Sequence, residues 1–258
     1  MRGLGGFSLK EISVIALISF GHMLSHFFFF VLPPLYLVLK TEFEVSYAVL
    51  ALPMAFYAVA AGITQTPVGF WVDRVGARKL LIVGLIIQGL SVAAIGFSST
   101  FWQLVAFYTI TGIANTVFHP ADYAILSGSI AKERLGRAFS LHLASGNLGW
   151  VFVPGVMIGL SEIWDWRIAF MIVGTLGCLF GFIVWVFSKI LSEETTKIPN
   201  SDNHSAEKKP DFAILGPSIC EKKNIKTNKL EPNIIETKTI KGFAMFLNLY
   251  KFKEIGFF

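Results

Sequence analysis

The sequence has few charged residues and few cysteines, and each scarcity excludes a class of protein. Charged residues make up 15% of the 258 positions, against roughly 25% in a soluble domain. Hydrophobic residues make up 54%, and the mean hydropathy is +0.63. This composition excludes an ordinary soluble domain and predicts an integral membrane protein. The two cysteines, Cys178 in an apolar run and Cys220 in a polar stretch, provide neither a disulfide framework nor a metal-binding spacing.

Motifs of enzymes and of nucleic-acid-binding proteins are also missing from the sequence. It contains no nucleophile elbow, phosphate-binding glycine loop or metal-ligand cluster, so we expect no enzyme activity, no cofactor and no bound metal. The net charge of +5 comes from cations scattered over loops and the C-terminal stretch. An anionic lipid surface explains these cations better than nucleic acid does, and no nucleic-acid partner is expected.

Long apolar runs fill most of the first 190 residues. Each approaches or exceeds the ~20 residues that a helix needs to cross the hydrocarbon core of a bilayer. We predict six spans, at residues 12–39 with a break at Pro33-Pro34, 47–72, 80–97, 102–127, 138–160 and 168–189. The predicted fold class is therefore an all-α membrane protein, with a six-helix transmembrane bundle over residues 1–190.

Basic residues at the ends of these spans predict the orientation of the bundle. The loops on the side opposite the N-terminus contain only two basic residues, Lys40 and Arg167. Because positively charged loops stay in the cytoplasm, both termini are expected there, in the inner (plasma) membrane of a bacterium. The cations on the predicted cytoplasmic side are Arg2, Lys10, Arg74, Arg78, Lys79, Lys132, Arg134, Arg137 and Lys189.

The composition changes after about Ser192. Residues 193–236 are rich in Lys, Glu, Asn, Thr and Pro and have no sustained apolar period, which predicts a disordered cytoplasmic segment. An apolar stretch at 242–250 is too short to span a membrane and is typical of an interfacial helix. We expect residues 191–258 to form a polar tail distinct from the bundle.

A charged turn between the second and third spans is the most informative motif. Glycine has no Cβ and permits sharp turns, so Gly69 and Gly76 are expected to shape this hairpin. Its cations hold it in the cytoplasm, and Asp73 can pair with them or with a helix N-terminus. The motif reads Gly69-Phe-Trp-Val-Asp73-Arg74-Val-Gly76-Ala-Arg78-Lys79.

Ionisable side chains within the spans are candidate functional residues, because burying them in a membrane is costly. His22 and His26 lie one turn apart and share a helix face. His119 and Asp122 lie three residues apart and share another. Histidine changes its charge near neutral pH, so these groups can form a proton or substrate path. A structural role for the histidines, or a gate formed by the second pair, stays open.

Two asparagines, Asn115 in the fourth span and Asn147 in the fifth, join this candidate path. For His142, which follows Arg137 by only about one turn, we favour a structural role.

The fifth span also contains a candidate hinge. Proline removes a backbone donor, and neighbouring glycines let the helix bend or pack closely. Bending there would change which side of a cavity is open, whereas an ordinary proline kink is the alternative reading. The hinge residues are Gly146, Gly149, Pro154 and Gly155.

Three further stretches narrow the class of transporter. They read Ala114-Asn-Thr-Val-Phe118-His119-Pro120, then Gly146-Asn147-Leu-Gly149 followed by Pro154, then Trp166-Arg167-Ile-Ala-Phe170. Together with the charged turn, they resemble the major facilitator superfamily and, within it, the fosmidomycin resistance branch. Two positions depart from that branch, since Ala121 and His26 stand where acids would be expected.

The resemblance implies alternating-access transport of a small organic solute, with proton-coupled efflux of the drug-resistance type. Superfamily members have two six-helix halves, and residues 12–190 resemble the first. The expected partners are therefore the solute, protons, the lipid bilayer and a second transporter half. The alternative is a truncated or inactive half-transporter that serves, if at all, as a non-transporting membrane subunit.

Overall fold

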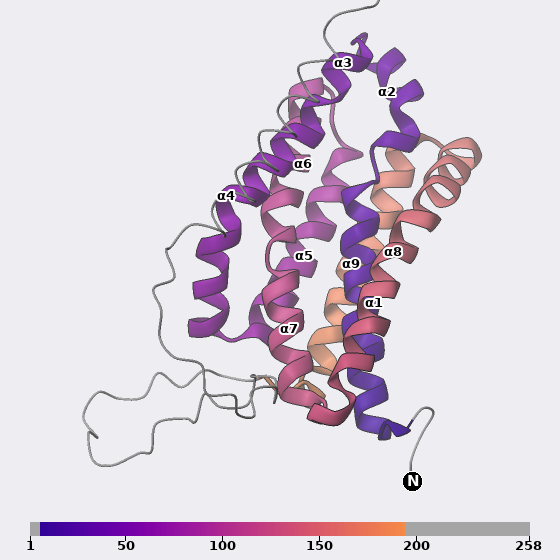
Figure 1. Ribbon diagram of the computed structural model, residues 1–258. Coiled ribbons are helices and arrows are strands. Elements are labelled where there is room, and N and C mark those ends of the chain that lie inside the picture. Colours follow the sequence, from indigo (N-terminus) through magenta and orange to yellow (C-terminus); the bar gives the residue numbers. More distant parts are fainter. Residues whose placement is uncertain (1–5, 194–258) are drawn as a thin grey trace, which may run out of the picture. The chain divides into compact units, whose positions relative to one another are not determined.

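The computed structural model describes residues 6–193, which form a bundle of helices (Figure 1). The predicted disordered segment and interfacial helix lie outside the described residues. A 3-10 turn at Pro33–Leu35 separates the first two α-helices, and another at Ser188–Ile190 follows the last one. The α-helices are α1 (Leu9–Phe29), α2 (Tyr36–Glu42), α3 (Tyr47–Leu50), α4 (Leu52–Val75), α5 (Ala77–Ile95), α6 (Phe101–Asn115), α7 (Phe118–Ser129), α8 (Lys132–Ile163) and α9 (Trp166–Val186).

Five helical segments are long and apolar enough to cross a membrane, which confirms the all-α membrane fold. The fourth predicted span, 102–127, is instead divided into α6 and α7, each too short to qualify by itself. Pro120 explains the division, because it has no N–H for the carbonyl of Thr116 and its ring clashes with that carbonyl. Helix α6 accordingly ends at Asn115, with Thr116 as its C-cap.

The turn between α4 and α5 is built on Gly76 alone. Gly76 has a φ of 101°, a left-handed conformation that favours glycine over residues with a Cβ. Gly69 lies inside the regular helix α4, seven residues earlier, so the prediction that it shapes the hairpin is wrong. A residue with helical backbone angles needs no special freedom.

The apolar core of the bundle consists of two clusters, one toward each end. One cluster includes Phe28, Tyr108 and Val153, and the other includes Ile18, Ala121 and Ala138. Along α1 and α8, the buried His22 and His142 lie between members of the two clusters, whereas the buried Asp122 of α7 lies among members of the second cluster. The bundle therefore has a buried polar layer where α1 and α8 pass from one apolar cluster to the other.

Polar contacts join chain segments at the end of the bundle where α1 begins (Figure 1). Glu11 Oε1 of α1 accepts a hydrogen bond of 2.8 Å from Arg134 Nη2 of α8. Ser129 Oγ, at the end of α7, donates to the Ser192 carbonyl at 2.8 Å. The α4–α5 and α7–α8 turns lie at this same end, as the charge pattern predicted.

Candidate functional site

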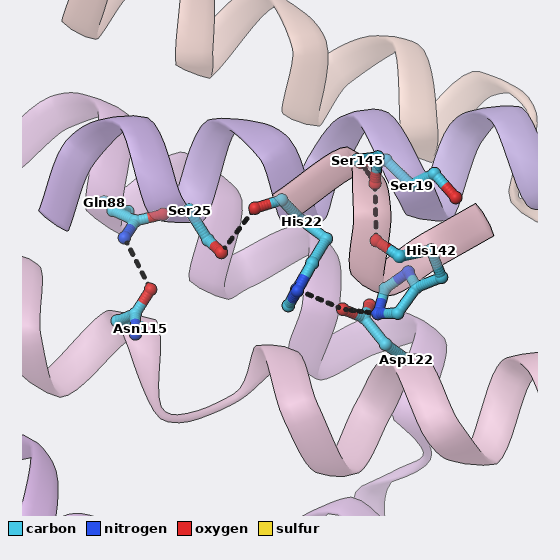
Figure 2. A network of polar contacts seen from close by, with 8 residues as sticks. All are labelled: Ser19, His22, Ser25, Gln88, Asn115, Asp122, His142 and Ser145. Atoms are coloured by element: carbon cyan, nitrogen blue, oxygen red, sulfur yellow. Dashed lines mark hydrogen bonds and ion pairs between the residues drawn. The ribbon is translucent and has the colours of Figure 1, made fainter. Parts of the chain in front are cut away.

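A buried carboxylate faces two histidines in the middle of the bundle (Figure 2). Asp122 Oδ2 of α7 lies 3.5 Å from His22 Nδ1 of α1 and 3.5 Å from His142 Nε2 of α8. The side chains are 0%, 1% and 0% exposed, respectively. The three residues are called the His–Asp triad below.

The His–Asp triad has unsatisfied hydrogen-bonding capacity. Both Asp122 carboxylate oxygens, His22 Nδ1 and both His142 ring nitrogens are buried and have no hydrogen-bond partner among the described residues. A separation of 3.5 Å exceeds the usual 2.7–3.2 Å of an N–H···O bond. Unpaired buried polar groups cost free energy, so such a concentration makes the His–Asp triad a candidate functional site.

Two further histidines, both half-buried, lie beside the triad. The His26 ring lies 4.4 Å, and the His119 ring 5.3 Å, from the His22 ring, measured between centroids. His26 also stacks on Trp150 of α8, with centroids 4.8 Å apart. These contacts confirm that His22 and His26 share a helix face, and they bring His119 toward the same centre.

Two glycines of α8 allow α1 to come close enough to build this site. A Cβ added at Gly146 would lie 2.6 Å from His22 Cδ2 and 3.1 Å from His26 Cε1. A Cβ at Gly149 would collide with the carbonyl of Met23. Both glycines belong to the predicted hinge, but here they act as close-packing positions between α1 and α8.

The other two residues of the predicted hinge, Pro154 and Gly155, are not shown to be close-packing positions. Helix α8 continues through Pro154, and a Cβ at Gly155 would meet nothing within 4 Å. Bending at Pro154 and Gly155 therefore stays a prediction.

The two asparagines of the predicted path lie in different surroundings. Asn115 Oδ1 accepts a hydrogen bond of 3.1 Å from Nε2 of the buried Gln88, which joins α6 to α5 (Figure 2). Asn147 is exposed on α8 and lies outside the buried layer. The structure thus gathers the histidines and Asp122 and leaves Asn147 apart from them.

At the charged turn, Glu193 makes the contacts with a cation and a helix N-terminus that the sequence suggested for Asp73. Glu193 Oε2 accepts a 3.0 Å hydrogen bond from the Arg78 backbone N–H, in the first turn of α5. Its Oε1 lies 3.5 Å from Arg78 Nη2. Asp73 is exposed and makes no ion pair with any residue in the described range 6–193. The suggested pairing of Asp73 with the neighbouring cations is therefore not present in this conformation.

Sequence reasoning missed His142 and Glu193 as members of these clusters. His142 was given a structural role because it follows Arg137 closely, yet α8 turns it into the buried layer beside Asp122. Its position on the same helix face as Gly146 and Gly149 was the signal that could have found it. For Glu193, which lies far along the chain from Arg78, the sequence contains no such signal.

Comparison with known proteins identifies the family. The chain matches the Major Facilitator Superfamily over residues 18–250. It belongs to that superfamily. The solved structure of a bacterial homolog of the human lysosomal transporter Spinster, inward-facing and unoccupied, has the same fold, with a TM-score of 0.66. It is 18% identical, and the match covers 73% of this chain and 45% of that one.

The relatives that this chain resembles carry different named roles. A probable L-galactonate transporter of Escherichia coli K12 is 26% identical over 149 residues, 58% of this chain and 33% of the relative. A multidrug resistance protein, MdtG of Salmonella heidelberg, is 32% identical over 114 residues, 44% of this chain and 28% of the relative. The chain thus spans about a third of the length of these transporters.

Proposed function

We propose that this superfamily member takes part in proton-coupled efflux of a small organic solute by alternating access. The observation that carries the proposal is the buried His–Asp triad, contributed by three helices of a major facilitator fold. Coupling of alternating access to protons needs ionisable groups within the membrane that can take up and release a proton. The similarity to a multidrug resistance protein and the fosmidomycin-resistance-like motifs favour efflux over uptake.

Residues 1–190 are proposed to supply the first six-helix half of such a transporter, with 191–258 as the segment that follows it. The half presents α4 and α8 with many exposed apolar side chains, including Ile63 and Val151. Lipid and a second half, from a copy or from another chain, would cover these faces. The loop cations support an orientation with the α4–α5 and α7–α8 turns on the cytoplasmic side of a bacterial inner membrane.

Everted membrane vesicles containing the full chain test this function directly. We expect a proton gradient to drive uptake of at least one fosmidomycin-like or other small organic compound into these vesicles. Vesicles with Asp122→Asn at equal protein level are the matched control and should lose the gradient-dependent part. Equal flux in both preparations, or no flux with any compound although the chain is inserted, would favour a non-transporting membrane subunit.

A further inference from the structure

The His–Asp triad has the composition and spacing of a transition-metal site. Two imidazoles and one carboxylate, each from a different helix, offer ligand atoms that all lie within 4.8 Å of one another. We propose that His22, Asp122 and His142 bind one divalent first-row transition-metal ion, such as Zn²⁺ or Co²⁺. This inference goes beyond transport and does not depend on it, because binding is measured on the isolated protein.

The distances fit ligands of one ion better than they fit hydrogen bonds. Zinc bonds of ~2.0–2.2 Å to nitrogen and oxygen set neighbouring tetrahedral ligands about 3.3–3.5 Å apart. Asp122 Oδ2 lies 3.5 Å from each histidine nitrogen that faces it. A hydrogen-bonded triad would instead be drawn to about 2.7–3.2 Å. The ligand atoms of the two histidines lie within 4.8 Å of each other.

The donor chemistry selects the class of cation. Neutral imidazole suits Zn²⁺, Co²⁺, Ni²⁺ and Cu²⁺, whereas Mg²⁺ and Ca²⁺ prefer all-oxygen sites. Two histidines with one carboxylate also leave coordination positions open for water or a solute group. The proposed site is therefore a three-ligand site for a borderline metal.

Burial supports the same conclusion. The triad is at most 1% exposed, and its facing atoms have no hydrogen-bond partners within residues 6–193. A dication would satisfy all of these atoms at once and balance the carboxylate charge in a region of low dielectric. The half-buried His26 and His119, in ring contact with His22, mark a polar route by which an ion could enter.

Binding would also join three helices. His22 is on α1, Asp122 on α7 and His142 on α8, and a shared ion would hold them in the observed arrangement. Because the ligands must be deprotonated, metal binding would release protons and weaken as the pH falls. Metal and protons would then compete for the site that the transport proposal uses.

Cobalt titration of the full chain, purified in detergent and stripped with EDTA, tests the proposal. We expect one equivalent of Co²⁺ per chain and the visible absorption bands of a low-coordinate site. His22→Gln, Asp122→Asn and His142→Gln should each weaken binding by more than the about 10–100-fold typical of outer-shell changes. His204→Gln, which removes the remaining histidine of the chain, is the control and should bind as the wild type does.

A gain-of-signal variant keeps the test decisive if these substitutions impair folding. His142→Cys should add a thiolate-to-cobalt charge-transfer band that the wild type lacks, because a cysteine at a ligand position replaces the imidazole. Absence of that band in a folded variant, or unchanged affinity in folded Asp122→Asn, would overturn the proposal. Metal binding without transport would leave it intact and count only against the transport function.

Discussion

Gly146 of α8 lies directly against the imidazole of His22 on α1, where an added Cβ would approach His22 Cδ2 to 2.6 Å. The glycine therefore fixes how closely the two helices pack and where His22 points. Small residues serve this purpose in membranes because lipid offers no hydrophobic force between helices, so close packing must hold them together. The position of the buried histidine thus depends on the absence of a side chain on its neighbour.

Replacing Gly146 with Ala should destabilise the bundle. The extra methyl group must displace His22 or separate α1 from α8, and overpacking of this kind costs about 1–3 kcal/mol. Thermal unfolding of the purified chain in detergent measures the effect. Gly159→Ala is the matched control, because it lies on the same helix and a Cβ there would meet nothing within 4 Å. Equal loss of stability in both variants would contradict the packing role.

Removing the carboxylate at Asp122 should abolish pH-dependent solute exchange. Asn keeps the size of the side chain but cannot take up or release a proton between His22 and His142. Counterflow in proteoliposomes at several pH values measures this, with insertion checked by protease accessibility. Replacing His119, whose ring also contacts that of His22, with Gln should produce a weaker effect, because His119 lies outside the triad. An unaltered pH profile for Asp122→Asn would return the cluster to a structural role.

Breaking the contact between Arg134 and Glu11 should loosen one end of the bundle. The side chain of Glu11 is 7% exposed and accepts hydrogen bonds from Arg134 and from the Ala131 backbone N–H. Loss of a hydrogen bond to a charged group costs about 1.5–3 kcal/mol, so Arg134→Ala should lower the free energy of unfolding by that amount. Lys132→Ala, an exposed cation two residues earlier, should change it by less than about 0.5 kcal/mol. A similar loss in both would indicate a general charge effect.

Asp73→Asn should reduce solute flux without reducing the amount of protein in the membrane. Asp73 is exposed and has no ion pair with any other described residue, so the folded bundle does not depend on it. If it acts, it does so in another state of the transport cycle. Flux normalised to membrane protein level tests this, and unchanged flux would argue against any role in the cycle.

The membrane character and most span positions could be predicted from the sequence, because helix length and hydropathy are local properties. The break expected at Pro33-Pro34 is confirmed, since a 3-10 turn at Pro33–Leu35 separates α1 from α2. The division of the fourth span was missed although Pro120 was visible, because a proline can be tolerated within a membrane helix when neighbours satisfy the freed backbone groups. Pro154 in α8 is such a case.

The sequence by itself determined that this chain crosses a membrane as apolar helices with its cations concentrated at one end. It also identified His22, His26, His119 and Asp122 as candidate functional residues, because burying ionisable side chains in a membrane costs free energy. Only the tertiary structure decided that Asp122 faces His22 and His142, because these residues come from three helices. The glycines of α8 set how closely α8 approaches α1 there. Periodicity predicts which face of a helix a residue occupies, but the partner across that face is set by helix packing.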